Sequence, residues 1–208
     1  MNEISQPETM RGQLTRLAEL KQSTRTDHQS VDDMVMAMAP FDSLENYKRF
    51  LRLQYIFHST MRPLYVADDL NQLMPGLADR SRYGAVSMDI DDMGCEVPDF
   101  RSRQDIAQIG MARVGWLYVC EGSSLGAAFL LKAAAGIGLT ADFGARHLAA
   151  HADGRGRHWR EFVDQVNNLA LGKNEDEMVR DGACAAFEFF RNLLMVEAAR
   201  TADTQSHG

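Results

Sequence analysis

The amino-acid sequence predicts an all-α protein that folds as one domain of about eight helices. Apolar residues recur three and four positions apart along most of the chain, while the alternating pattern of strands is scarce. The five prolines are widely spaced, and none follows residue 98. A chain of 208 residues is long enough to build a full core. We expect a flexible tail at 1–8, the domain at 9–200 and a second flexible tail at 201–208.

The first expected helix spans residues 9–38 and stops before Pro40, because the residue before a proline avoids the helical conformation. Lys21 and His28 lie seven positions apart in this helix. Seven residues are close to two turns, so the two side chains should share one face. His28 is then either a satisfied structural histidine or, as a neutral imidazole, a ligand for iron.

The second expected helix spans residues 44–62 and follows Asp42 and Glu45, whose spacing resembles a capping box. It carries Gln54 and His58, which lie one turn apart on the same face. Each of these two polar residues stands alone among apolar neighbours. They are either ordinary surface residues or part of a buried polar set that holds ordered water.

A short helix at 68–74 and a longer one at 77–93 are expected next. Arg82 lies near the middle of the longer helix, and Gly94 is a plausible C-terminal cap. As an isolated charge in an apolar segment, Arg82 belongs with the two polar residues of the preceding helix as a candidate for the same water-holding set.

The longest expected helix spans residues 103–135 and holds Gly122 and Gly126, four apart and therefore on one face. Each glycine in a helix interior costs roughly 1 kcal/mol relative to alanine. Two glycines on one face, with Ser123 and Ser124 between them, indicate that something approaches the backbone closely. Another helix and a flat ligand would each satisfy this requirement.

Residues 142–158 are expected to form a polar loop, which is long enough to be functional or packed by its own side chains. His147 and His151 have the spacing of two metal ligands on a helix, but nearby glycines favour a loop with ordinary hydrogen bonds. Helices at 159–171 and 174–200 complete the expected fold.

Composition excludes several classes of protein. The net charge is 22 − 29 = −7, which argues against a general nucleic-acid binder. The three cysteines form no C-x-x-C pair, so we expect free thiols in a reducing cytoplasm rather than a zinc knuckle or a disulfide framework. No signal peptide is apparent, and no apolar stretch reaches the roughly 18 residues of a membrane span. The motifs of zinc proteases, nucleophile elbows and phosphate loops are missing.

These patterns together resemble the bacterial heme oxygenase family over residues 14–199. The resemblance rests most specifically on Gly115-Trp-Leu-Tyr-Val-Cys-Glu-Gly-Ser-Ser-Leu-Gly-Ala-Ala-Phe-Leu. The other matching segments are residues 20–28, 53–58, 144–149 and 154–159. The family fold implied by this resemblance places heme between a proximal and a distal helix.

The resemblance also implies roles for individual residues. His28 matches the proximal iron ligand, and Gly122 and Gly126 match distal-helix positions where the backbone comes close to the heme. Ser123, which we include among the heme-binding residues, stands where the mammalian branch has an aspartate, so no carboxylate can anchor water there. The remaining matches hold the propionates (Lys21 and Tyr118), line the pocket (Phe187) or order distal water (Gln54, His58 and Arg82).

The activity implied is cleavage of heme b by O2 to biliverdin, carbon monoxide and Fe2+ for iron acquisition. Lys21 and Tyr118 match the branch expected to give the α isomer. Electrons would come from a ferredoxin or an NADPH-dependent flavoprotein reductase, and we expect a monomer that contacts neither nucleic acid nor membrane. Two alternatives remain open: a heme-binding or storage protein without turnover, and a thiaminase-II-like helical enzyme that needs no heme.

Overall fold

The computed structural model describes residues 15–96, 106 and 109–206, with side chains described as far as residue 202. Over these ranges the chain is helical and forms no β-strand, only isolated bridges from Thr140 to residues 143 and 144. This confirms the expected all-α fold. The helices are α1 (Arg16–Ser23), α2 (Arg25–Ala37), α3 (Leu44–Tyr65), α4 (Asp68–Leu73), α5 (Tyr83–Asp92), α6 (Ala112–Ala135), α7 (Arg155–Asn167) and α8 (Lys173–Ser206), with 3₁₀ turns η1 (Ala78–Arg80) and η3 (Arg146–Leu148).

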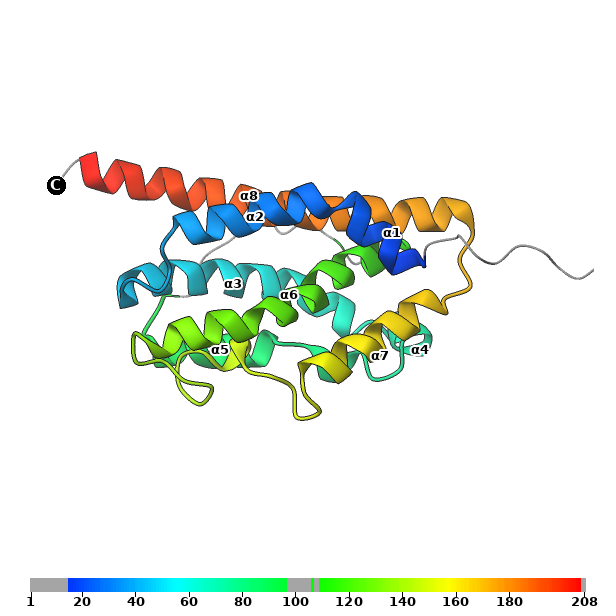
Figure 1. Ribbon diagram of the computed structural model, residues 1–208, viewed down its shortest axis with the longest axis horizontal. Coiled ribbons are helices and arrows are strands. Elements are labelled where there is room, and N and C mark those ends of the chain that lie inside the picture. Colours follow the sequence, from blue (N-terminus) through cyan, green and yellow to red (C-terminus); the bar gives the residue numbers. More distant parts are fainter. Residues whose placement is uncertain (1–14, 97–105, 107–108, 207–208) are drawn as a thin grey trace, which may run out of the picture.

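The long C-terminal helix α8 packs against both α2 and α6. Figure 1 shows α2 and α8 side by side along one edge of the molecule, with α3 and α6 beneath them. α6 packs more extensively against α8 than against any other element, and α2 also packs against α8. α2 and α6 have few direct contacts with each other. On the opposite side, α5 packs on α3 and α7 packs on α6.

Two glycines let the backbones of α6 and α8 touch. A Cβ atom added at Gly115 would lie 1.9 Å from the carbonyl oxygen of Val179, and one added at Gly182 would lie 2.0 Å from that of Ala112. No side chain fits in either place, because real Cβ atoms do not approach backbone atoms so closely. The close helix-to-helix packing that glycines permit is therefore found at these two positions.

The first expected helix is divided at Thr24 into α1 and α2. The backbone angles of Thr24 (φ −98°, ψ 6°) depart from helical values, and its buried hydroxyl donates to the carbonyl of Leu20 at 2.7 Å. Ser and Thr side chains that bond a carbonyl four residues earlier weaken a helix locally and often bend it. Because Lys21 precedes this division and His28 follows it, their spacing alone no longer places them on one face.

The helix expected at 77–93 is also shorter than predicted, and Arg82 does not lie in its middle. Ser81 has an extended backbone (ψ 128°), so the chain leaves the η1 turn there and α5 begins only at Tyr83. The hydroxyl of Ser81 accepts a hydrogen bond from the Tyr83 N–H at 3.4 Å. Arg82 consequently occupies the N-cap position of α5.

Two helix ends test the expected capping residues. Gly94 follows α5 in the left-handed region (φ 56°), and its N–H donates to the carbonyl of Asp91 at 3.1 Å, so the predicted C-terminal cap is confirmed. At the start of α3 the cap is Ser43 rather than Asp42. The Ser43 hydroxyl accepts a hydrogen bond from the Asn46 N–H at 3.1 Å.

The long helix α6 begins later than the expected helix at 103–135. Gly110 has a left-handed backbone (φ 58°), and the helix starts two residues further on at Ala112. The expected N-terminal signal at Ser102 lies outside the described residues. The helix ends at Ala135, as expected.

The polar loop expected at 142–158 is partly helical. It contains η3, and α7 begins at Arg155 directly after Gly154, whose φ of 81° favours glycine. The helix expected at 159–171 therefore starts and ends about one turn early. α8 includes residues 201–206, which we expected in a flexible C-terminal tail.

Among the described helices, α6 alone is long and apolar enough to cross a membrane by length and composition. In the most apolar part of this helix, 44% is buried inside the protein. Core helices of soluble proteins pass the same test, so this property is weak evidence for a membrane span. The contacts of α6 with α3, α7 and α8 are those of a core helix.

We expect alanine to have opposite effects at two glycines of α6. Gly115→Ala should lower the free energy of unfolding of the apoprotein by about 1–3 kcal/mol, because the new methyl group overlaps the α8 backbone. Gly126→Ala should raise it by about 1 kcal/mol, because nothing lies within 4 Å of the new methyl group and alanine favours the helix. Urea unfolding followed by circular dichroism measures both. Equal effects at the two positions would contradict this packing.

Candidate functional site

His28 stands on α2 with its imidazole largely open to solvent. Its side chain is 61% exposed, and its Nδ1 atom lies 3.2 Å from the carboxylate of Asp32, one turn further along the helix. A carboxylate at Nδ1 favours the proton on that nitrogen and leaves the lone pair of Nε2 available to a metal. Phe187, from α8, meets the imidazole edge to face with ring centroids 5.9 Å apart. The resemblance implied that Phe187 lines the heme pocket, and this role stays a prediction.

The face of α6 that carries Gly122 and Gly126 is covered by α7 only at its Gly122 end, through the side chain of Trp159. A Cβ atom added at Gly122 would meet only the ring of Trp159, at 3.7 Å, and one added at Gly126 would meet nothing within 4 Å. Leu125 and Phe129 on the same side of the helix are 43% and 66% exposed. Of the two partners that the sequence allowed for these glycines, a closely packed helix backbone is found at neither: α7 reaches Gly122 only through the Trp159 ring, and no described residue lies within 4 Å of a Cβ atom added at Gly126. The face offers bare backbone flanked by apolar side chains.

Tyr118 lies on α6 one turn before Gly122 and is half-buried. Its ring centroid is 6.1 Å from that of Trp159. Burial raises the pKa of Tyr118, and a hydrogen bond with the Thr24 side chain partly opposes this rise. The interaction links α6 to the division between α1 and α2. Lys21 is exposed in the last turn of α1, three residues before that division.

The two serines between the glycines turn back onto their own helix. Ser123 donates to the carbonyl of Cys120 at 2.7 Å, and Ser124 donates to that of Glu121 at 2.7 Å. Arg155 donates to the carbonyl of Ser124 at 2.7 Å. The hydroxyl of Ser123 thus already has an acceptor within α6.

The predicted water-holding set lies partly inside the protein. His58 on α3 is buried, with its Nδ1 atom 3.7 Å from the sulfur of Cys120. Burial lowers the pKa of His58 to about 3, with smaller contributions from His147, in its protonated form, and from the charge of Arg82. Arg82 is half-buried and donates to the carbonyl of Ala149 at 2.7 Å. His58 and Arg82 are therefore close enough to interact, and His58 is neutral at physiological pH.

Gln54 is half-buried on α3, one turn before His58. The spacing places both side chains on the same face of the helix. All three members of the predicted set thus come from the region between α3 and the start of α5.

A second buried polar network, centred on Glu121, was missed in the sequence. Glu121 directly precedes Gly122 and is almost fully buried. It accepts hydrogen bonds from the Tyr65 hydroxyl at 2.7 Å and from Arg80 at 3.0 Å, and His158 Nε2 lies 3.2 Å away. Burial raises the pKa of Glu121, but these three partners together hold it below its usual value. The signal in the sequence was an acidic residue inside an otherwise apolar run.

Asp89 and His147 form a further buried pair that we did not predict. Asp89 on α5 is completely buried and accepts hydrogen bonds from the His147 Nδ1 atom at 2.8 Å and from the backbone N–H groups of Arg146 and His147, each at 2.9 Å. His147 is therefore not a ligand paired with His151. The ring of His151 instead stacks on that of His158 with centroids 3.5 Å apart.

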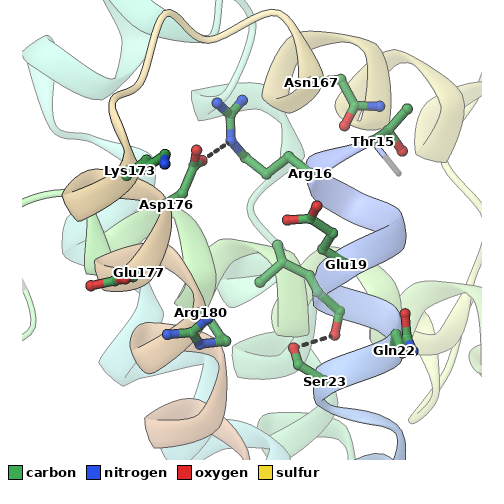
Figure 2. Close-up of a pocket in the computed structure, with 11 residues that line it drawn as sticks. Thr15, Arg16, Glu19, Gln22, Ser23, Asn167, Lys173, Asp176, Glu177 and Arg180 are labelled. Atoms are coloured by element: carbon green, nitrogen blue, oxygen red, sulfur yellow. Dashed lines mark hydrogen bonds and ion pairs between the residues drawn. The ribbon is translucent and has the colours of Figure 1, made fainter. Parts of the chain in front are cut away.

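An open pocket of about 900 Å³ lies elsewhere, between α1 and the start of α8 (Figure 2). Its lining mixes acidic and basic side chains, and Arg16 forms an ion pair with Asp176 across it. Neither His28 nor the two distal glycines line this pocket. Within the described residues, no three His, Cys, Asp or Glu side chains converge as a metal site. A single histidine with an open side remains the best candidate for holding a metal.

Comparison with known proteins identifies the family. The family model described as heme oxygenase matches residues 15–196, which is most of the chain. The chain belongs to the heme oxygenase family. Among its relatives is heme oxygenase PigA of Pseudomonas aeruginosa, 40% identical over 189 residues that cover 90% of this chain and 95% of the relative.

Solved structures of heme oxygenases share the fold. That of the NO- and CO-bound heme oxygenase from Neisseria meningitidis is 42% identical, covers 89% of this chain and 92% of its own, and superposes with a TM-score of 0.84. Heme oxygenase from Leptospira interrogans has a TM-score of 0.73 at 14% identity, covers 87% of this chain and 98% of its own, and supports the fold alone. The chain is accordingly a heme-degrading oxidoreductase, and the thiaminase-II-like alternative is set aside.

Burial of His58 makes the heme oxygenase apoprotein sensitive to acid. Because the pKa of His58 is about 3 in the folded chain and about 6.5 in the unfolded chain, the unfolded state binds more protons as pH falls below 6.5. Between pH 7 and pH 5, His58 alone should lower the free energy of unfolding by about 2 kcal/mol. Urea unfolding of His58→Gln should show a pH dependence smaller by this amount. Parallel curves for both proteins would be incompatible with a buried neutral imidazole.

Proposed function

We propose that this heme oxygenase opens the heme ring with O2 and external electrons to give α-biliverdin, carbon monoxide and ferrous iron, and that it serves iron acquisition. Family membership supports the reaction class. The observation that carries the proposal for the site is the glycine-bearing face of α6, which is open at Gly126 and bordered at Gly122 only by the Trp159 ring, on a fold that also leaves the imidazole of His28 exposed. Bare backbone beside exposed apolar side chains suits a large flat apolar ring.

His28 is the residue best suited to hold the heme iron. Its Nδ1 atom is engaged by Asp32, so its Nε2 atom is free to donate a lone pair. The Phe187 ring supports the imidazole edge on and limits its rotation. When bound, heme supplies the iron that activates O2 and the carbon framework that is oxidised, while the protein supplies orientation and proton delivery.

Gly122 and Gly126 would admit the ring close to the backbone of the distal helix. Neither position carries a side chain that could donate a hydrogen bond above the iron. The hydroxyls of the two serines between them, Ser123 and Ser124, donate to carbonyls of their own helix. The character of the distal pocket decides among binding, activation and transfer of O2. A pocket of bare backbone and water suits activation of O2 beside the ring edge.

Protons would reach the distal side through water held by Gln54, His58 and Arg82. Because its pKa is near 3, His58 is neutral and can both accept and donate a hydrogen bond. Arg82 is fixed by the Ala149 carbonyl. These residues would therefore orient water rather than give up their own protons.

Electrons would come from a ferredoxin or an NADPH-dependent flavoprotein reductase, with the enzyme acting as a monomer in the cytoplasm. The cysteines at 95, 120 and 184 are all free, which suits a reducing compartment. The alternative of a heme carrier without turnover rests on the same pocket. The two functions differ only in the fate of the bound heme once it is reduced in air.

Hemin titration and turnover test the proposal directly. With hemin, a reductant and air, the Soret band should disappear and verdoheme and biliverdin should form; a stable ferrous–oxy spectrum would instead favour the carrier. His28→Ala should bind hemin at least about tenfold more weakly and fail to turn over, and added imidazole should restore activity. Gln29→Ala, at the neighbouring exposed position on α2, is the control. Undiminished turnover by His28→Ala without imidazole would place the iron elsewhere.

We expect Lys21 and Tyr118 to set the product isomer by seating the heme propionates. Removing the Lys21 charge and the Tyr118 hydroxyl together, in Lys21→Asn with Tyr118→Phe, should allow the ring to rotate and shift the product from α toward β and δ biliverdin. Chromatography of the biliverdin isomers measures the shift. Lys173→Asn, which removes a charge from the start of α8, should leave the product unchanged. An all-α product from the double variant would refute this assignment.

A further inference from the structure

The buried pair of Asp89 and His147 lies beside the predicted water-holding set and has an unused nitrogen. The side chains of the pair are 0% and 1% exposed, and the Oδ2–Nδ1 distance is 2.8 Å. Burial raises the pKa of Asp89, but hydrogen bonds from His147 and from the backbone of Arg146 hold it below its usual value. The carboxylate is therefore ionised and can only accept hydrogen bonds.

An ionised carboxylate at Nδ1 fixes the tautomer of His147. The proton lies on Nδ1, so the lone pair of the neutral ring lies on Nε2. That Nε2 atom is buried and finds no hydrogen-bond partner among the described residues. Buried polar atoms in folded proteins are almost always paired with protein groups or with ordered water.

Neighbouring residues connect His147 to the catalytic region. Its ring lies 6.4 Å from that of Phe50 on α3, and it is near enough to His58 on the same helix that a positive charge on His147 would lower the pKa of His58. Gln54 lies on α3 between Phe50 and His58, one turn from each. Arg82 donates to Ala149, two residues after His147, and its Nε atom is likewise buried without a partner among the described residues.

We propose that His147 is a positioning residue whose Nε2 atom accepts a hydrogen bond from a buried water, and that this water extends the set of Gln54, His58 and Arg82 to Asp89. The proposal rests on the function proposed above only for its effect on turnover. Asp89 holds the ring so that Nε2 stays an acceptor, and the water in turn presents its other hydrogen and its lone pairs to the α3 side. The inner end of the distal water set is then anchored to a charge that cannot move.

The apoprotein tests the site without any heme. Long-range 1H–15N spectra of the imidazole rings should show His147 protonated at Nδ1 and unprotonated at Nε2, and a crystal structure should show a water about 3 Å from Nε2. A proton on Nε2, or an Nε2 atom without water, would overturn the proposal even if the enzyme degrades heme normally. Failure of the wild-type protein to degrade heme would instead count against the proposed function, whatever the spectra show.

Substitution separates positioning from packing. His147→Asn keeps an amide N–H near Asp89 but removes the acceptor at the position of Nε2. Its turnover should fall about tenfold with hemin affinity unchanged, and the signals of His58 in the apoprotein spectrum should shift. Phe50→Leu perturbs packing against the same ring without changing a polar atom, and should leave the His58 signals and turnover close to wild type. Equal losses in the two variants, or wild-type turnover by His147→Asn, would show that the pair only supports the fold.

Discussion

The contact between the backbones of α6 and α8 is the constraint on which the site depends. Gly115 and Gly182 each lie where a methyl group would overlap the backbone of the other helix. The two backbones touch at these positions, and this contact sets the distance between the axes of α6 and α8. α2 also lies on α8. The separation between His28 and the face of Gly122 is therefore set indirectly, because both helices take their position from a shared third one. Little direct contact between α2 and α6 is needed to define it.

Rotation of α6 about its own axis is fixed by a different interaction. A buried carboxylate must be paired, because leaving it unpaired inside the protein is costly. Glu121 finds its partners on α3, η1 and α7, through Tyr65, Arg80 and His158. With Glu121 held in this direction, the adjoining glycine is directed to the open side. The glycines supply the bare surface, and the buried charge beside them determines where it faces.

The sequence predicted the parts of this arrangement that depend on local pattern. Helical periodicity predicted the all-α fold, which the structure confirms. The glycine pair allowed either a helix or a flat ligand as its neighbour, and the assignment of that neighbour to heme stays a prediction. Pattern could not reveal the division at Thr24, because it arises from one hydroxyl bonding its own backbone. The partners of Glu121 and Asp89 also could not be predicted from the sequence pattern. Tyr65 and His147 are 56 and 58 positions away from them, so only the folded chain brings these groups together.

The exposed Phe129 and Leu125 have a consequence for the life of the protein in the cell. Without substrate, Leu125 and Phe129 form an apolar strip that is exposed to water. Most soluble monomers keep exposed apolar patches small. Any molecule that covers this strip in the folded state and not in the unfolded chain shifts the folding equilibrium by mass action. At the site proposed here, heme would be a stabilising partner as well as the compound consumed, and each completed turnover would return the polypeptide to its less protected form. Resistance to proteolysis would accordingly rise and fall with the supply of the molecule that the enzyme destroys.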